Sequence, residues 1–216
     1  MDDIARRPLS GLTHLGAALA AVVGSVVLVL AGGKSPMKVA VLSVYGLSLI
    51  FLFGSSSAYH LIKAGPETIV RLRKLDHAAI YELIAGSYTP ICAIMFTGFW
   101  RWGFLAVIWS LAAAGIIVKM FVIKAPRWVT AGVYVLLGGI SLAAAGEARR
   151  ALPAGALIGL AVGGLIYTVG AVIYITKKLD LFPGKFGFHE VWHVFVILAA
   201  LAHYVTIAVY VAPAGR

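Results

Sequence analysis

The chain has 216 residues, of which 62% are apolar, and its mean hydropathy is +0.98. Soluble domains contain only about 45–50% apolar residues, so the composition excludes an ordinary soluble domain. The net charge of +10 does not indicate a nucleic-acid partner. Lys and Arg lie mostly between the apolar stretches, as they do in proteins that follow the positive-inside bias of membranes.

Apolar stretches long enough to cross a bilayer, which takes about 20 residues, recur along the whole chain. The sequence therefore predicts an all-α, polytopic membrane protein built as a bundle of seven transmembrane helices. The expected spans, in chain order, are 11–31, 38–62, 77–97, 102–122, 127–147, 153–176 and 187–211. The longest connectors, 63–76 and 177–186, leave no room for a separate soluble domain, so residues 1–216 are expected to form a single domain.

The basic residues set the expected orientation of the bundle. They are more numerous in the N-terminal tail and in the connectors after the second, fourth and sixth spans than in the remaining connectors. This bias places the N-terminus in the cytoplasm. An odd number of spans then places the C-terminus outside.

Small residues recur at four-residue spacing on two spans. Gly155, Gly159 and Gly163 lie on the sixth, and Gly16, Ala20 and Gly24 lie on the first. Such stripes let another helix backbone approach closely. Packing within the chain is the preferred interpretation, and a homo-oligomer interface is the alternative.

Histidines gather at the expected cytoplasmic ends of two spans. His60 closes the second span, and His189 and His193 open the seventh. Residues four apart share one helix face, so the last two imidazoles are neighbours. Three neutral imidazoles with a fourth position open to water are a common catalytic zinc site. The sequence therefore predicts a Zn²⁺ ion held by His60, His189 and His193.

Two further polar residues lie close to these histidines in the sequence. Asp76 is expected to open the third span at the same depth, where it orients the water or acts as general base; a helix N-cap is the alternative. Ser56 lies four residues before His60, and its hydroxyl could position the water or stabilise developing charge. Glu82 lies about 9 Å further along the helix than Asp76, at a depth where an unpaired carboxylate is costly. Pairing is the preferred interpretation, and protonation or a wet cavity are the alternatives.

The run from His189 to His193 also fits the HExxH pattern, in which a glutamate, here Glu190, is the base of a metalloprotease. A metzincin would continue with a glycine and a third histidine shortly afterwards, and this chain does not. His203 is ten residues on, about 15 Å along a helix, and cannot reach the same ion.

Three motifs together resemble a known family. They are Ser56-Ser57-Ala58-Tyr59-His60, the run from Lys74-Leu75-Asp76-His77 to Ala85-Gly86-Ser87-Tyr88-Thr89-Pro90, and His189-Glu190-Val191-Trp192-His193 followed by His203. They are similar to the hemolysin III family, the bacterial branch of the progestin and adipoQ receptors, which is more distantly related to alkaline ceramidases.

The resemblance spans the chain and implies a seven-helix bundle in a bacterial inner membrane, with a zinc ion near the cytoplasmic leaflet. Its ligands would match His60, His189 and His193, accompanied by Asp76 and Ser56. Because the position of Glu190 varies among relatives, the resemblance favours an incidental role for it. Bacterial members show an acidic residue and an asparagine before the Thr-His pair that matches Thr13 and His14, and this chain departs from that pattern, so no role is assigned to His14.

The preferred functional hypothesis is a zinc-dependent hydrolase that attacks a lipid amide or ester with a zinc-activated water. The resemblance motivates the lipid, which would enter from the bilayer. The alternatives are a non-enzymatic regulator or sensor of membrane lipid state with a structural zinc and, ranked last, a pore-forming hemolysin. A pore predicts polar stripes along several spans, whereas these spans are polar mainly at their ends.

Overall fold

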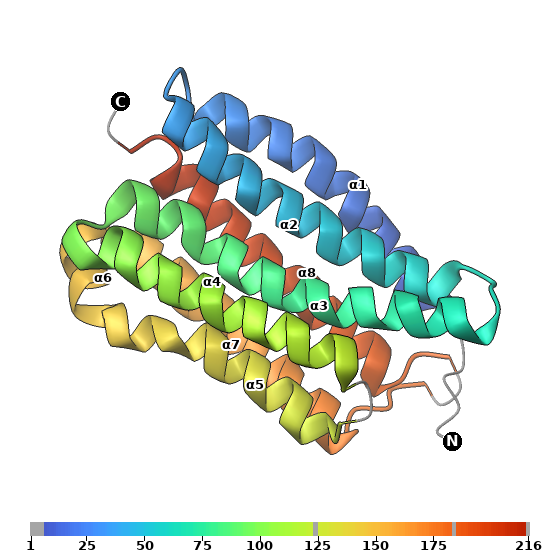
Figure 1. Ribbon diagram of the computed structural model, residues 1–216. Coiled ribbons are helices and arrows are strands. Elements are labelled where there is room, and N and C mark those ends of the chain that lie inside the picture. The colour runs from blue at the N-terminus through green and yellow to red at the C-terminus, as the bar shows by residue number, and fades with distance from the viewer. Residues whose placement is uncertain (1–6, 123–124, 183–184, 215–216) are drawn as a thin grey trace.

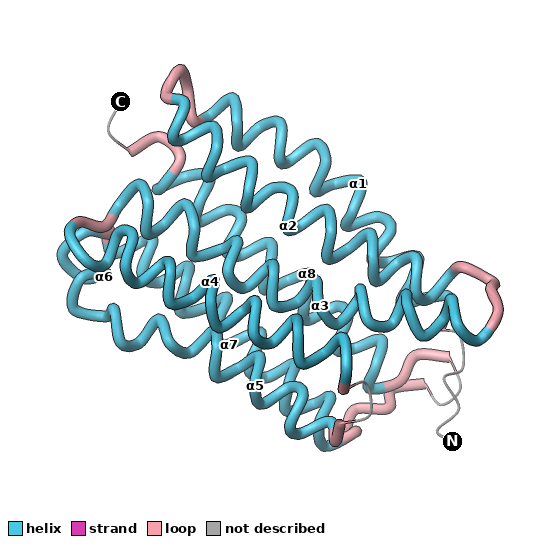
Figure 2. Tube along the Cα trace, viewed as in Figure 1, coloured by secondary structure: helices cyan, strands magenta, loops and turns pink. Residues whose placement is uncertain are grey.

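The computed structural model describes residues 7–122, 125–182 and 185–214, and these form helices joined by loops, without a β-strand (Figure 2). The helices in chain order are α1 (Pro8–Ala31), α2 (Pro36–Leu61), α3 (Pro66–Pro90), the π-helix η1 (Ile91–Met95), α4 (Gly98–Phe121), α5 (Arg127–Gly139), the 3₁₀ helix η2 (Ile140–Ala144), α6 (Ala145–Ala151), α7 (Ala154–Thr176), α8 (Phe188–Thr206) and the π-helix η3 (Ile207–Val211).

Seven continuous helical segments in this part of the chain are long and apolar enough to cross a membrane, as predicted. Three of them combine adjacent elements: η1 continues α3 to Met95, η2 and α6 continue α5 to Ala151, and η3 continues α8 to Val211. The chain is therefore a multi-pass membrane protein.

Short loops between successive spans make the bundle antiparallel. In Figure 1, α1, α3, α5 and α8 begin and α2, α4 and α7 end at the same end of the bundle. We call this the histidine end and the other the far end. Within the bundle, α1 packs against α2 and α8, α2 packs against α3, and α7 packs against α8.

Proline marks the start of most spans. Pro8, Pro36 and Pro66 occupy the first turns of α1, α2 and α3, while Pro126 and Pro153 directly precede α5 and α7. Proline suits these positions because its fixed φ angle is helical and the first amide groups of a helix have no intrahelical acceptor. The helix boundaries thus follow a local signal that hydropathy alone does not show.

The third helix begins eleven residues earlier than predicted, at Pro66 rather than at residue 77. The charges in residues 66–75 lower the hydropathy of this segment, but Glu, Arg, Lys and Leu are all good helix formers. Pro66 and Glu67 in the first turn add favourable start signals. The predicted connector 63–76 is therefore mostly helix, and Asp76 lies well inside α3 instead of at its beginning.

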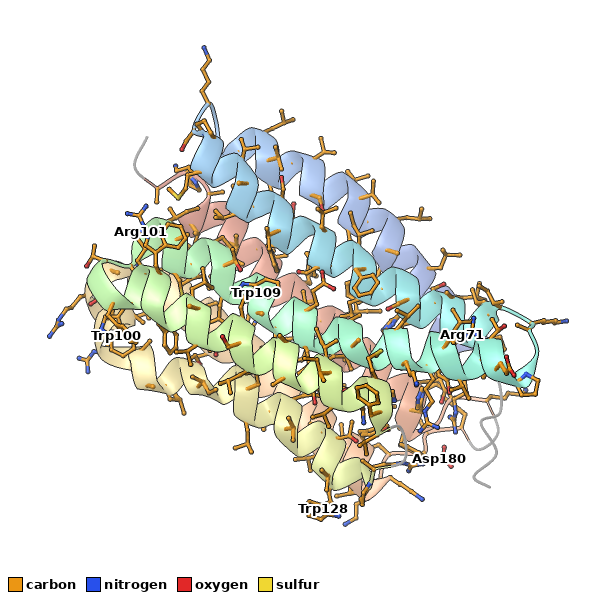
Figure 3. The ribbon with its side chains drawn as sticks, in the orientation of Figure 1. Arg71, Trp100, Arg101, Trp109, Trp128 and Asp180 are labelled. Carbon is orange, nitrogen blue, oxygen red and sulfur yellow. The ribbon has the colours of Figure 1, made fainter. Side chains whose placement is uncertain are left out.

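Large apolar side chains cover the outside of the bundle. Leu30 and Leu136 are each 72% exposed and Phe121 is 83% exposed, which in water would be a large aggregation-prone surface. Tryptophan occurs at both ends, with Trp128 at the histidine end and Trp100 at the far end (Figure 3). Apolar flanks with aromatic residues at both ends are what a bilayer and its two interfaces favour.

The glycine stripe of α7 is used within the chain. A Cβ atom at Gly155, Gly159 or Gly163 would collide with Tyr210, Thr206 or His203, respectively. The predicted intramolecular packing is therefore confirmed for this stripe. On α1 it is confirmed only at Gly24, which faces Tyr204, because a Cβ atom at Gly16 would meet nothing within 4 Å.

Candidate metal centre

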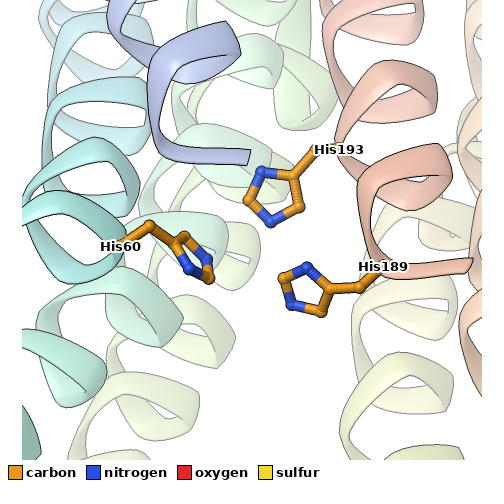
Figure 4. A group of neighbouring side chains, drawn as sticks. All are labelled: His60, His189 and His193. Atoms are coloured by element: carbon orange, nitrogen blue, oxygen red, sulfur yellow. The ribbon is translucent and has the colours of Figure 1, made fainter. Parts of the chain in front are cut away.

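The three predicted ligands come together at the histidine end (Figure 4). His60 extends from the last turn of α2, and His189 and His193 extend from the first turns of α8. The ring centroid of His60 lies 5.2 Å from that of His189 and 5.0 Å from that of His193. The ring centroids of His189 and His193 are 4.7 Å apart. His60 and His193 are buried, and His189 is partly buried.

The arrangement of the rings fits a metal ion. One nitrogen from each histidine lies within 4.8 Å of the others. Zinc binds nitrogen at about 2.0–2.1 Å, so the nitrogens of a tetrahedral site are about 3.3 Å apart, and small side-chain rotations would reach that spacing. Nδ1 of His193 is buried without a hydrogen-bond partner. Burying an unpaired polar nitrogen costs free energy, and coordination of a metal ion by His193 would lower that cost.

Asp76 and Ser56 form a second polar pair close to this group. Ser56 is only 2% exposed and lies beside the Asp76 carboxyl, within reach of its hydroxyl. Ser56 precedes His60 by four residues, so the pair lies about 6 Å from His60 along the axis of α2. Because Asp76 is ten residues into α3, the N-cap interpretation is wrong, while its position beside Ser56 fits the expected common site.

Glu190 points into the start of its own helix and into α1, which accounts for its burial at 5% exposure. Its Oε2 accepts hydrogen bonds from the Arg7 guanidinium at 2.8 Å and from the Gly187 amide at 2.9 Å. The Gly187 bond caps the first turn of α8, and the Arg7 contact is an ion pair. These contacts support a structural role rather than that of a protease base.

Three other polar residues inside spans lie outside the group. His203 interacts through Nε2 with the Leu160 carbonyl at 3.2 Å, in agreement with the prediction that it cannot join the ion. Nδ1 of His77 lies 3.3 Å from the Tyr134 hydroxyl. Glu82 is partly buried and has no ion-pair partner among the described residues, so the expected pairing is not found.

The sequence interpretation missed the contribution of α1. His14 is 3% exposed and its ring centroid lies 4.0 Å from that of His193. Ser10 is fully buried, and its hydroxyl oxygen lies 3.4 Å from Nδ1 of His189. Their four-residue spacing, which puts both on one face of α1, was the signal available in the sequence.

Together the fold and this group define a class of protein: a multi-pass helical membrane protein whose buried histidines can hold a metal ion at one end of the bundle. Imidazole ligands suit zinc, copper, iron and nickel.

The chain belongs to the haemolysin-III related family, whose model matches residues 3–204. It is 32% identical to Hemolysin-3 of Bacillus cereus over 94% of this chain and 91% of that protein. It is also 32% identical to a Hemolysin-3 homolog of Bacillus subtilis (strain 168), over 78% of this chain and 76% of the relative. An adiponectin receptor protein of Drosophila melanogaster is 30% identical over 76% of this chain, which corresponds to 41% of that receptor. The family resemblance expected from the motifs is confirmed.

Proposed function

We propose that this protein is a zinc-dependent hydrolase that cleaves an amide or ester bond of a membrane lipid. The observation that carries the proposal is the group of three histidines, because three nitrogen ligands leave one position open, as in catalytic rather than structural zinc sites. The neighbouring Ser56 and Asp76 supply the polar groups that such chemistry needs.

Each residue of the site has a distinct task in this proposal. His60, His189 and His193 would hold the ion, and bound zinc supplies a Lewis acid that lowers the pKa of water towards 7. Asp76 accepts the proton of the attacking water and returns it to the leaving nitrogen or oxygen as the acyl bond breaks. Ser56 holds the Asp76 carboxyl in place through its hydroxyl.

The surroundings of the site favour a lipid as substrate. The flanks of the bundle are apolar, so a lipid can approach from the bilayer and present its carbonyl group near the histidine end. Membrane lipids are therefore the proposed partners, with a fatty acid and an amine or alcohol as products.

Fatty-acid release from purified protein tests this proposal. The protein is loaded with zinc in lipid nanodiscs that contain an N-acyl sphingoid lipid, a phospholipid or a monoacylglycerol, and free fatty acid is measured by mass spectrometry. We expect release from at least one lipid with the wild type and none with His60→Ala. Zinc-loaded wild-type protein that releases no fatty acid from any of them would contradict the proposal.

A regulatory function is the second candidate, and one observation favours it. A metal held by His60 of α2 and the two histidines of α8 would tie two separate helices together, which is the role of a structural site. A relative carries the name of a receptor. Retained zinc without turnover, together with stability that depends on the lipid present, would support this candidate over the hydrolase.

We also propose that the N-terminus lies in the cytoplasm of a bacterial cell membrane, so that the histidine end faces the inner leaflet. Arg7, Arg71 and Lys119 all lie at this end of the bundle, which fits the positive-inside bias. A C-terminal alkaline phosphatase fusion is then expected to be active, and a C-terminal green fluorescent protein fusion dark. The opposite pattern would place the histidines on the outer side.

A further inference from the structure

The first turns of α1 lie directly against the histidine group, although none of the three proposed ligands comes from this helix. Ser10 and His14 share one face of α1 and are almost completely buried. Gly11 permits this approach, because a Cβ atom there would lie 2.6 Å from Cγ of Leu61 and 3.0 Å from Cβ of His60. The contact between α1 and the end of α2 therefore depends on a missing side chain.

We infer that Ser10 and His14 are positioning residues for the metal site: Ser10 orients the ring of His189, and His14 holds the ring of His193. The inference rests on the metal site proposed above and assigns α1 a role in it. Partners behind metal-bound histidines commonly fix the ring orientation and the tautomer, and their loss weakens metal binding.

The hydrogen bonds of Ser10 determine which nitrogen of His189 is free. The Ser10 hydroxyl oxygen lies 3.4 Å from Nδ1 of His189 and 3.4 Å from Oε1 of Glu190. A hydroxyl has one proton to donate and an ionised carboxylate can only accept, so Ser10 donates to Glu190 and accepts from Nδ1–H of His189. This tautomer leaves the lone pair of Nε2 available for a metal ion.

Glu190 can serve as a fixed acceptor because its other oxygen is already held. Oε2 accepts the hydrogen bonds from Arg7 and from the Gly187 amide, so the carboxylate cannot turn away from Ser10 without breaking them. Arg7 directly precedes α1 as its N-cap, and Ser10 lies in the first turn of this helix. The chain of contacts therefore runs from Arg7 through Glu190 and Ser10 to His189.

His14 restrains the second histidine of α8 by packing. The His14 ring is tilted by 37° to that of His193, with 4.0 Å between the ring centroids. It also makes an edge contact with Phe53, with 5.1 Å between the centroids. Nε2 of His14 lies 3.5 Å from the His193 carbonyl oxygen, to which it can donate. Among the described residues, no side chain makes a hydrogen bond to Nδ1 of His193. The position of this ring thus depends on the stacked imidazole.

Zinc affinity of the purified full-length protein, measured by competition with a chromogenic chelator, tests the inference. We expect Ser10→Ala and His14→Ala each to raise the zinc dissociation constant by about 10–100-fold, as loss of outer partners does in other sites. Thr13→Ala is the matched control, since its hydroxyl donates to the Ser10 carbonyl of its own helix and bonds to no other group in the described part of the chain. It is expected to bind zinc like the wild type.

Two measurements separate positioning from a general effect on folding. Ser10→Thr, which restores a hydroxyl, is expected to recover affinity, and the visible spectrum of bound Co²⁺ is expected to change in Ser10→Ala but not in Thr13→Ala. In wild-type protein labelled with ¹⁵N-histidine, nuclear magnetic resonance is expected to show His189 protonated at Nδ1 and ligating through Nε2. This last measurement tests the role of Ser10 even if the variants do not fold.

The inference is overturned if folded Ser10→Ala and His14→Ala bind zinc within about twofold of the wild type, well short of the usual loss, or if His189 ligates through Nδ1. Wild-type protein that binds no zinc would overturn both the inference and the metal site. Zinc binding that depends on Ser10 and His14 in a protein without hydrolytic activity would support the inference and contradict only the proposed hydrolase.

Discussion

His60→Ala is expected to abolish stable zinc binding, because it removes the only ligand that α2 contributes to the group. The loss of affinity should exceed the roughly 10–100-fold effect of removing an outer partner. Purified wild-type protein is expected to retain about one zinc per chain, as one set of three ligands allows, and the variant almost none. Elemental analysis by plasma mass spectrometry measures the difference.

Stability should change together with the metal content. A ligand at 1,000 times its dissociation constant stabilises the folded state by about 4.1 kcal/mol, so added zinc should raise the melting temperature of the wild type and not that of His60→Ala. His203→Ala is the matched control, because this histidine is also on α8 and partly buried but contacts Leu160 instead of the group. A His60→Ala protein that keeps one zinc per chain would refute the assignment of His60.

Asp76→Asn is expected to retain zinc and lose hydrolysis. Asparagine keeps the shape of the side chain and its contact with Ser56, but it cannot accept a proton from water as a carboxylate does. Loss of a general base costs about 10²–10⁴-fold in rate, and the fatty-acid release assay can measure that range. Zinc content should remain that of the wild type, because Asp76 is not among the three grouped ligands.

Asp180→Asn provides the matched control for this change. Asp180 lies in the loop between α7 and α8, where a Cβ atom on Gly187 would collide with it, so the same chemical substitution is made outside the spans. It is expected to leave both zinc content and turnover unchanged. If Asp76→Asn loses its zinc, then Asp76 belongs to the metal site itself; if it hydrolyses lipid at the wild-type rate, it is not the base.

The two variants together distinguish the candidate functions. A hydrolase requires both residues for turnover and only His60 for zinc binding. A regulator with a structural metal requires His60 for stability, and neither variant would then affect a reaction. Because the readouts are metal content, melting temperature and product, each can change independently of the others.

The sequence by itself determined the class of fold and the identity of the three grouped histidines. Seven apolar stretches of this length cross a bilayer as helices, because a helix pairs the backbone polar groups of each segment within that segment. Once the spans and their alternating direction are known, His60, His189 and His193 must lie at the same end. Periodicity then puts His189 and His193 on one face of α8.

Hydropathy predicted the start of a helix less well where charged residues are themselves good helix formers. The charged residues that precede Asp76 lower the hydropathy, so the third span was predicted to begin at residue 77, whereas the helix starts at Pro66. Asp76 was expected to open the third helix, whereas it lies ten residues inside it. Its pairing with Ser56 depends on how α2 and α3 face each other, which hydropathy does not specify.

Only the tertiary structure decided the surroundings of the histidines. The stacking of His14 on His193, the contact of Ser10 with His189 and the ion pair between Arg7 and Glu190 each join residues about 180 positions apart. Hydrophobic periodicity reports which face of a helix is buried but not which neighbour buries it. The close packing of α1 against α2, permitted by Gly11, and its packing against α8 bring these side chains into contact.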